Sequence, residues 1–287
     1  MQATNIPDSD FENHLAFNSH NYQISEKAFG LFKELIYEKA GITLSAAKRT
    51  LVVSRLSKRM RELKIISFED YYEKVISNSS ELQLAIDSLT TNETYFFRED
   101  KHFDFLKKNI LSKTSSGNDF KVWSAASSTG EEAYSTAMVL ADKFGFQSNW
   151  QIIGTDINQN VLTMARKGLY PLIESEKIPR NYLTQYCLKG MRSQSEMMLM
   201  DSKLKSHTSF EFMNLNADWP SQISNFDVVF LRNVMIYFDL PTKQRLVDKI
   251  ANKIKPGGYL FIGHSETLNQ VSNRFKVVQP AICQKVR

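Results

Sequence analysis

The sequence predicts an α/β fold with a helical amino-terminal part and a small inserted antiparallel β-subdomain. From about residue 120, short apolar strands alternate with helices, which is typical of a parallel sheet covered on both faces. Residues 22–89 show helical spacing of their apolar side chains instead. Residues 170–213 interrupt the alternation with short segments, two of which could be hairpin strands, so we expect the β-subdomain there.

The helical part, residues 22–89, contains one helix with two distinct sides. We expect this helix at about Ser45–Leu63, with apolar residues at helical steps on one side. Lys48, Arg55 and Arg59 fall on the adjoining side, at steps of seven and four. No acidic residue interrupts them, so the sequence predicts a small helical bundle with one basic face.

The second part of the chain carries the alternating elements. One expected helix begins with Pro241 and ends before a Pro-Gly-Gly sequence, which are typical boundary signals. The expected strands are KVWSA (121–125), WQIIGTD (150–156), FDVVFLR (226–232) and GYLFIGH (258–264), and the expected helices cover 131–144, 158–168 and 241–254. We place a linker and connecting helix at 90–119 and the α/β domain at 120–287.

The composition is that of an ordinary globular protein, with 42% hydrophobic and 23% charged residues. The net charge of +5 favours an acidic partner without requiring nucleic acid. Residues 1–21 are polar, lack the features of a secretory signal and are expected to form a flexible tail. No apolar run predicts membrane insertion. Cys187 and Cys283 form no CxxC pair, so we expect a cytoplasmic protein without a metal site.

Small or polar residues follow three expected strands, where open parallel sheets bind ligands. The first strand runs into AASSTGEE (125–132), whose Gly130 allows a ligand to approach the backbone closely. The second ends at Asp156, which can accept hydrogen bonds from both hydroxyls of a ribose. The third ends at Arg232-Asn233. Singly, Asp156 could be a helix cap, Gly130 a turn residue and Asn233 a loop residue. Together they predict a nucleoside pocket.

The segment TTNETYFFRE (90–99) lies between the helical part and the α/β domain. It combines three consecutive aromatic residues with the polar residues Asn92, Thr94 and Arg98. It could be a linker fixed by its aromatic side chains, or a lid that crosses the nucleoside pocket.

Four motifs resemble one known family: TTNETYFFRE, VWSAASSTGEEAYSTAM, FDVVFLRNVMIYFD and KPGGYLFIGHSE. They closely resemble the motifs of the chemotaxis receptor glutamate methyltransferases of the CheR type, in the family's order and over about residues 90–266. The helical part is similar to the family's amino-terminal domain. The resemblance implies a class I, Rossmann-like methyltransferase domain that uses S-adenosylmethionine. The implied products are glutamate methyl esters on receptors and S-adenosylhomocysteine.

The resemblance also implies site residues. The candidates for cofactor contacts are Asn92, Thr94, Arg98, Glu132, Asp156, Asn214, Leu215, Arg232 and Asn233. Among these, Asp156 would hold the ribose and Glu132 would face the charged end of the cofactor, with Glu131 as the second choice. Tyr237 would lie near the transferred methyl group, and Arg98 could orient the substrate carboxylate. Arg98 and Tyr237 are therefore the catalytic candidates.

The resemblance suggests acidic receptor helices as the partner of the basic face. Lys48, Arg55 and Arg59 could dock the methylation helices of a receptor's cytoplasmic domain, although a solvated charged face is the alternative. A receptor tail peptide could bind the β-subdomain. Two other functions stay open: methyl transfer to another protein, RNA or small molecule, and cofactor binding for regulation without catalysis. The net charge of +5 is low for RNA binding, so we expect no nucleic acid partner.

Overall fold

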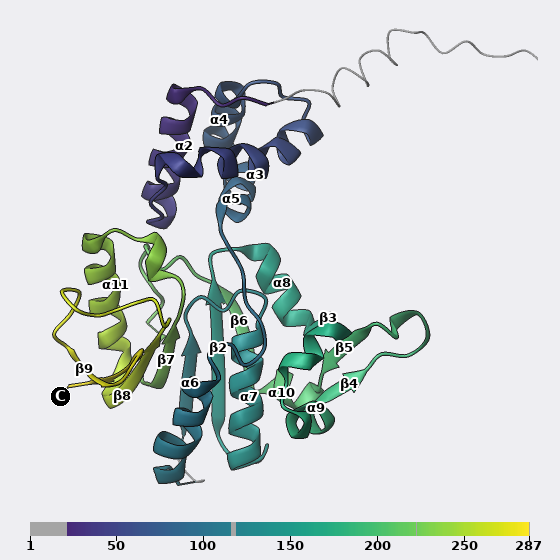
Figure 1. Ribbon diagram of the computed structural model, residues 1–287, viewed down its shortest axis with the longest axis vertical. Helices are drawn as coiled ribbons and strands as arrows, with labels where there is room; N and C mark the ends of the chain where they lie inside the picture. The colour runs from purple at the N-terminus through teal and green to yellow at the C-terminus, as the bar shows by residue number, and fades with distance from the viewer. Residues whose placement is uncertain (1–21, 116–118, 222, 287) are drawn as a thin grey trace, which may run out of the picture. The chain divides into compact units, whose positions relative to one another are not determined.

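The computed structural model describes residues 22–115, 119–221 and 223–286, and the tail expected at 1–21 lies outside them. The chain divides into two compact units, with the boundary between Thr90 and Thr91. Figure 1 shows the elements of both units, which are described separately below. Among the described residues, no helix is both long and apolar enough to cross a membrane.

The first unit is helical, as its pattern of apolar residues predicts. Its α-helices are α2 (Glu26–Ala40), α3 (Arg49–Glu62), α4 (Phe68–Ser77) and α5 (Ser79–Leu89). They bury Phe32, Leu56 and Tyr71 completely. The single helix expected at Ser45–Leu63 is instead the short 3₁₀ turn η1 (Ala46–Lys48) followed by α3. Side-chain oxygens cap α2, α4 and α5 by accepting backbone N–H bonds, and the capping residues are Ser25, Ser67 and Asn78.

The second unit is built on a seven-stranded sheet in the order β6-β2-β1-β7-β8-β10-β9. Its strands are β1 (Phe120–Ser124), β2 (Trp150–Asp156), β6 (Thr208–Phe212), β7 (Phe226–Leu231), β8 (Ile254–Ile262), β9 (Phe275–Gln279) and β10 (Ile282–Lys285). The first five in the spatial order are parallel, whereas β10 pairs antiparallel with both β8 and β9. The four strands expected from the sequence are confirmed, and the antiparallel edge is an addition to them.

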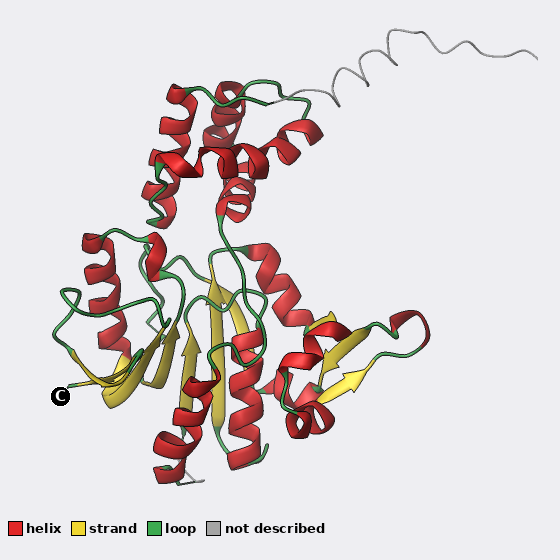
Figure 2. Ribbon diagram, viewed as in Figure 1, coloured by secondary structure: helices red, strands yellow, loops and turns green. Residues whose placement is uncertain are grey.

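Helices cover this sheet (Figure 2). α7 (Glu131–Phe144) connects β1 to β2 and α8 (Gln159–Lys167) follows β2, whereas α11 (Leu240–Lys253) connects β7 to β8 in the opposite direction along the sheet. Because such crossovers are right-handed, α7 and α8 lie on one face and α11 on the other. The connecting helix α6 (Asp100–Phe105) joins the hydrophobic core on the α7 face, where Phe103 stacks on Phe230 of β7.

A separate three-stranded antiparallel sheet follows α8, in the order β3-β5-β4. Its strands are β3 (Leu169–Pro171), β4 (Cys187–Lys189) and β5 (Met197–Met200). They confirm the small antiparallel subdomain. The extent expected for it, 170–213, is too long, because β6 within this range pairs with β2 of the main sheet. Residue alternation identifies a strand, but it does not say which sheet the strand joins.

Candidate active site

The carboxyl ends of β2, β1 and β7 lie side by side at one edge of the main sheet. Ser124, the last residue of β1, is in register with Gly154 of β2 and Phe230 of β7. The structure therefore brings together Asp156 and Arg232, which come at the ends of β2 and β7, with the loop that follows β1.

The loop after β1 ends at Gly130, which has a left-handed conformation with φ of 98°. A Cβ atom there would lie 2.9 Å from the Cβ of Ala165 and 3.0 Å from the hydroxyl oxygen of Tyr170. Internal packing therefore requires this glycine, rather than the ligand approach that we expected from the sequence. The Tyr170 hydroxyl also donates to the Thr129 carbonyl at 2.7 Å, which ties β3 to this loop.

Asp156 is buried at the end of β2, where backbone groups orient its carboxylate. Oδ2 accepts a hydrogen bond from the N–H of Ser128 and Oδ1 accepts one from the N–H of Asn158, both at 2.9 Å. The N-cap of α8 is Asn158, whose side chain accepts from the N–H groups of Asn160 and Val161. Asp156 is thus not the N-cap of this helix.

Arg232 lies between two carboxylates, with its side chain only 3% exposed. Its Nε is 3.5 Å from Glu99 Oε2 and 3.4 Å from Glu132 Oε2. One terminal nitrogen donates to the carbonyl of Arg98. Nε and the other terminal nitrogen have no hydrogen-bond partner in the described part of the chain. Since unsatisfied buried donors are unfavourable, this cluster is suited to receive a polar ligand.

Glu131 and Glu132, neighbours at the start of α7, have different surroundings. Glu132 accepts a hydrogen bond from the Ser124 hydroxyl at 2.6 Å and faces Arg232. Burial raises the pKa of its carboxyl, against the opposing effects of Arg232 and Ser124. Glu131 binds the Thr129 hydroxyl through both oxygens, at 2.9 and 2.6 Å. Of the two, it is Glu132 that contacts Arg232.

The segment expected as a linker or lid is bonded to the site. The Asn92 carbonyl accepts a hydrogen bond from the Ser128 hydroxyl at 2.8 Å, and the Arg98 carbonyl accepts one from Arg232. Thr94, between them, is half-buried. The Arg98 guanidinium donates to a carbonyl of its own segment at 2.6 Å. The segment therefore connects the loop after β1 to the residue that follows β7.

Two further candidates follow β6, beside Asp156. The N–H of Met213 donates to the carbonyl of Asp156 at 2.9 Å, which places Asn214 and Leu215 next to the end of β2. Leu215 lines a cavity of about 170 Å³ together with Phe238.

The loop after β7 is held by Glu266, a residue that the sequence analysis did not select. Its carboxylate accepts hydrogen bonds from the N–H groups of Gly263, Asn233 and Ile236, at 2.6, 3.0 and 3.3 Å. Asn233 is left-handed, with φ of 58°, which is uncommon for a residue other than glycine. Glu266 thus orders the loop that carries half-buried Tyr237. In the sequence, only the position of Glu266 at the end of GHSE could have indicated this role.

The basic residues of the first unit do not form an open row. Arg59 binds both oxygens of Glu81, at 2.9 and 2.8 Å. Arg55 donates to two backbone carbonyls at the end of α5, both at 2.8 Å. Lys48, in η1, is exposed. The expected basic face is therefore smaller than the sequence suggested, because two of its guanidinium groups make bonds within the unit.

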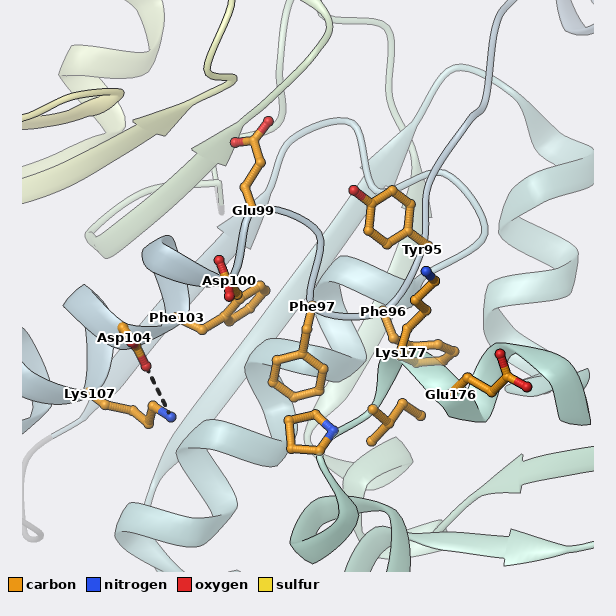
Figure 3. A pocket seen from close by; sticks show the side chains of 12 residues that line it. Tyr95, Phe96, Phe97, Glu99, Asp100, Phe103, Asp104, Lys107, Glu176 and Lys177 are labelled. Carbon is orange, nitrogen blue, oxygen red and sulfur yellow. Dashed lines mark ion pairs between the residues drawn. The ribbon is translucent and has the colours of Figure 1, made fainter.

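A second hollow of about 600 Å³ lies between α6 and η4 (Leu172–Lys177). The rings of Phe97 and Phe103 lie side by side in it, with centroids 5.0 Å apart. Figure 3 shows Glu99 pointing away from these rings. The Glu99 carboxylate belongs instead to the cluster around Arg232.

Two histidines complete the surroundings of Glu99. Oε2 of Glu99 is 3.4 Å from Nδ1 of His102 and 3.8 Å from Nε2 of His264. Burial, with Arg232 and His264 nearby, lowers the pKa of His102 to about 3. The sequence predicts no metal-ligand cluster, yet Glu99, His102 and His264 form a group that could hold a metal ion.

Comparisons with known proteins agree with this architecture. Residues 92–283 match the family described as CheR methyltransferase, SAM binding domain, and residues 27–90 match CheR methyltransferase, all-alpha domain. The chain is 39% identical over 255 residues to the chemotaxis protein methyltransferase of Escherichia coli, covering 88% of each chain. It is 38% identical over 277 residues to that of Klebsiella aerogenes, covering 96% of this chain and 94% of the relative. It is 36% identical over 264 residues to chemotaxis protein methyltransferase 2 of Pseudomonas aeruginosa, covering 91% and 94%.

The two family matches correspond to the two units of the structure, and the match to the SAM binding domain covers every strand end of the candidate site. The chain therefore belongs to the CheR methyltransferase family and has a domain that binds S-adenosylmethionine.

Proposed function

We propose that this chain transfers the methyl group of S-adenosylmethionine to glutamate side chains of chemotaxis receptors, giving methyl esters and S-adenosylhomocysteine. The observation that carries the proposal is the pair of Arg232 and Glu132, with Glu132 bonded to the last residue of β1, together with the oriented carboxylate of Asp156 at the end of β2. All three residues lie within the matched SAM binding domain. The names of the relatives supply chemotaxis as the context of the substrate. No contact described above favours RNA, a small molecule or regulation without catalysis.

The donors and acceptors of the site fit this cofactor. The unpartnered N–H groups of Arg232 suit its carboxylate, and the carboxylate of Glu132 suits its ammonium group. The oriented carboxylate of Asp156 suits the ribose hydroxyls. The residues that would surround the rest of the cofactor are Asn92, Thr94, Arg98, Asn214, Leu215 and Asn233.

The chemistry asks for positioning by the protein. Bound S-adenosylmethionine supplies a methyl group already activated by its sulfonium charge. A glutamate carboxyl, with a pKa of about 4.3, is already ionised at neutral pH. The chain therefore needs neither a general acid nor a general base, and its residues act by orienting the carboxylate and excluding water. Arg98 would orient the carboxylate by charge-assisted hydrogen bonds, and Tyr237 would add a hydroxyl contact.

Transfer of tritiated methyl groups into receptor-containing membranes tests this function. We expect base-labile radioactivity, because esters hydrolyse in base whereas N-methyl groups do not. Arg98→Ala and Tyr237→Phe should reduce turnover more than they weaken cofactor binding. Base-stable counts would exclude ester formation, and full activity in both variants would exclude the roles of these two residues.

Acidic receptor helices would dock on the first unit. Lys48 can be tested by itself, whereas reversing the charge of Arg55 or Arg59 would also break bonds inside the unit. Lys48→Glu should raise the KM for receptor, and more so at low ionic strength, because salt screens exposed charges. Lys143→Glu, a charge reversal at another exposed lysine, in the second unit, is the matched control. An unchanged KM in Lys48→Glu would remove Lys48 from the interface.

A receptor tail peptide would bind the three-stranded sheet. The protein would act in the cytoplasm, where receptor signalling domains lie. β4 is an edge strand of this sheet, and such an edge can pair with an extended peptide. Leu188 of β4 is 54% exposed and Met191 beyond it is 80% exposed. Met191→Asp should weaken binding of a receptor tail peptide in calorimetry, and equal affinity would place the peptide elsewhere.

A further inference from the structure

Glu99, His102 and His264 bring three potential metal-ligand atoms close together. Each offers one nitrogen or oxygen atom, and these atoms all lie within 4.8 Å of one another. His102 is three residues after Glu99 at the start of α6, whereas His264 follows β8. The group is therefore assembled by the fold and not by a local sequence motif.

The distances between the atoms suit a small ion. In a tetrahedral zinc site, bonds of about 2.0–2.1 Å put neighbouring ligand atoms about 3.3–3.4 Å apart. Oε2 of Glu99 is 3.4 Å from Nδ1 of His102 and 3.8 Å from Nε2 of His264. The third pair, His102 with His264, lies within 4.8 Å, so the side chain of His264, which is 50% exposed, would move inward to complete three corners of such a site.

His102 supplies a second, independent observation. Its residue is 1% exposed, yet neither ring nitrogen has a hydrogen-bond partner among the residues that the structure describes. Oε2 of Glu99 is likewise without a hydrogen bond. Buried polar atoms are nearly always satisfied, and an ion with bonds of about 2.0–2.1 Å could contact both of these atoms, which are 3.4 Å apart.

The ligand set indicates the class of metal. Two imidazoles and one carboxylate suit zinc, cobalt or nickel, whereas magnesium and calcium prefer sites made of oxygen atoms. The exposed ring of His264 gives an ion access from solvent, and water could fill the fourth position. We propose that Glu99, His102 and His264 form a binding site for a divalent transition-metal ion beside Arg232. This proposal does not depend on the proposed methyl transfer.

Metal binding to the full-length, untagged chain tests the proposal directly. Zinc affinity would be measured by competition with a chromophoric chelator, and cobalt binding by visible absorption, whose strong bands distinguish tetrahedral coordination. We expect one ion per chain. His264→Ala should weaken zinc binding by about 10–100-fold or more, since even the loss of a group behind the ligands has effects of this size. His102→Asn should do the same.

The matched control is a His14→Ala, His20→Ala double variant, which removes two histidines that lie outside the described residues. It should bind zinc with the affinity of the unmodified chain. Since His264 is exposed, His264→Ala is informative even if His102→Asn fails to fold, which tryptophan fluorescence would reveal. Equal zinc affinity in His264→Ala and the unmodified chain would overturn the proposal, as would loss of binding in the control.

Discussion

Two arginines, one in each unit, lie against carboxylates in different ways. Arg59 binds both oxygens of Glu81 at 2.9 and 2.8 Å, and Tyr71 donates to the same carboxylate at 3.0 Å. In contrast, Nε of Arg232 lies 3.5 and 3.4 Å from two carboxylates and makes no hydrogen bond to either.

The contrast indicates that Arg59 stabilises the fold, whereas Arg232 is available to bind a ligand. A bidentate pair with good geometry stabilises the structure, and losing one partner leaves the other unsatisfied. Arg232 keeps two buried N–H donors without a hydrogen-bond partner among the described residues, which leaves them available to a polar ligand. Charge alone does not make this distinction, since the sequence predicts binding roles for both arginines.

The largest expected effect comes from Arg232→Met. It should raise the Kd for S-adenosylmethionine by roughly 100-fold or more, because a charged pair in a buried site contributes several kcal/mol to binding. Arg59→Met, the same change in the first unit, should leave this Kd unchanged. Isothermal titration calorimetry measures both. Equal Kd values for Arg232→Met and the unmodified chain would erase the contrast between the two arginines.

Glu81→Gln should destabilise the first unit by about 1–3 kcal/mol, because it weakens the partly buried pair with Arg59. All three tryptophans, Trp123, Trp150 and Trp219, belong to the second unit. The unfolding transition seen by circular dichroism should therefore shift, while that seen by tryptophan fluorescence should not. Equal shifts in both signals would show that the pair does not act within its own unit.

The pH dependence of stability should differ in sign between Glu81 and Glu132. The hydrogen bond from Arg59 lowers the pKa of Glu81, whereas burial raises that of Glu132. The contribution of Glu81 is therefore present above its ordinary pKa of 4.5 and is lost as the pH falls. The contribution of Glu132 is present at low pH and is lost as the pH rises above 4.5.

Thermal unfolding from about pH 3 to pH 7 tests this difference in sign, with the effect of Glu81 mainly below pH 4.5 and that of Glu132 above it. Relative to the unmodified chain, Glu81→Gln should become less stable as the pH rises, and Glu132→Gln should become more stable. Parallel curves for the two variants would contradict the prediction.

The smallest effects are expected from two tyrosine-to-phenylalanine changes. Tyr71→Phe removes the bond to Glu81 and should lower stability by about 1 kcal/mol without changing cofactor affinity. Tyr170→Phe removes the bond to the Thr129 carbonyl, which helps to hold the loop after β1. It should raise the Kd for S-adenosylmethionine about five-fold, the equivalent of about 1 kcal/mol. A change in cofactor affinity in Tyr71→Phe, with none in Tyr170→Phe, would contradict the prediction.

The sequence by itself determined the α/β alternation, the four expected strands and the positions of Asp156 and Arg232 at strand ends. These features follow from apolar periodicity and from the order of elements along the chain, which are local properties. The family motifs pointed to the same residues and also to Glu132.

Only the tertiary structure decided that β6 joins the main sheet, that Arg59 forms hydrogen bonds to Glu81 within the first unit, and that His264 lies close to Glu99 and His102. The residues in these contacts lie far apart in the chain, and a residue's type does not reveal which distant partner it will meet. Burial then decides what each contact does, because removal from water makes a satisfied pair stabilising and leaves an unsatisfied donor available to a ligand.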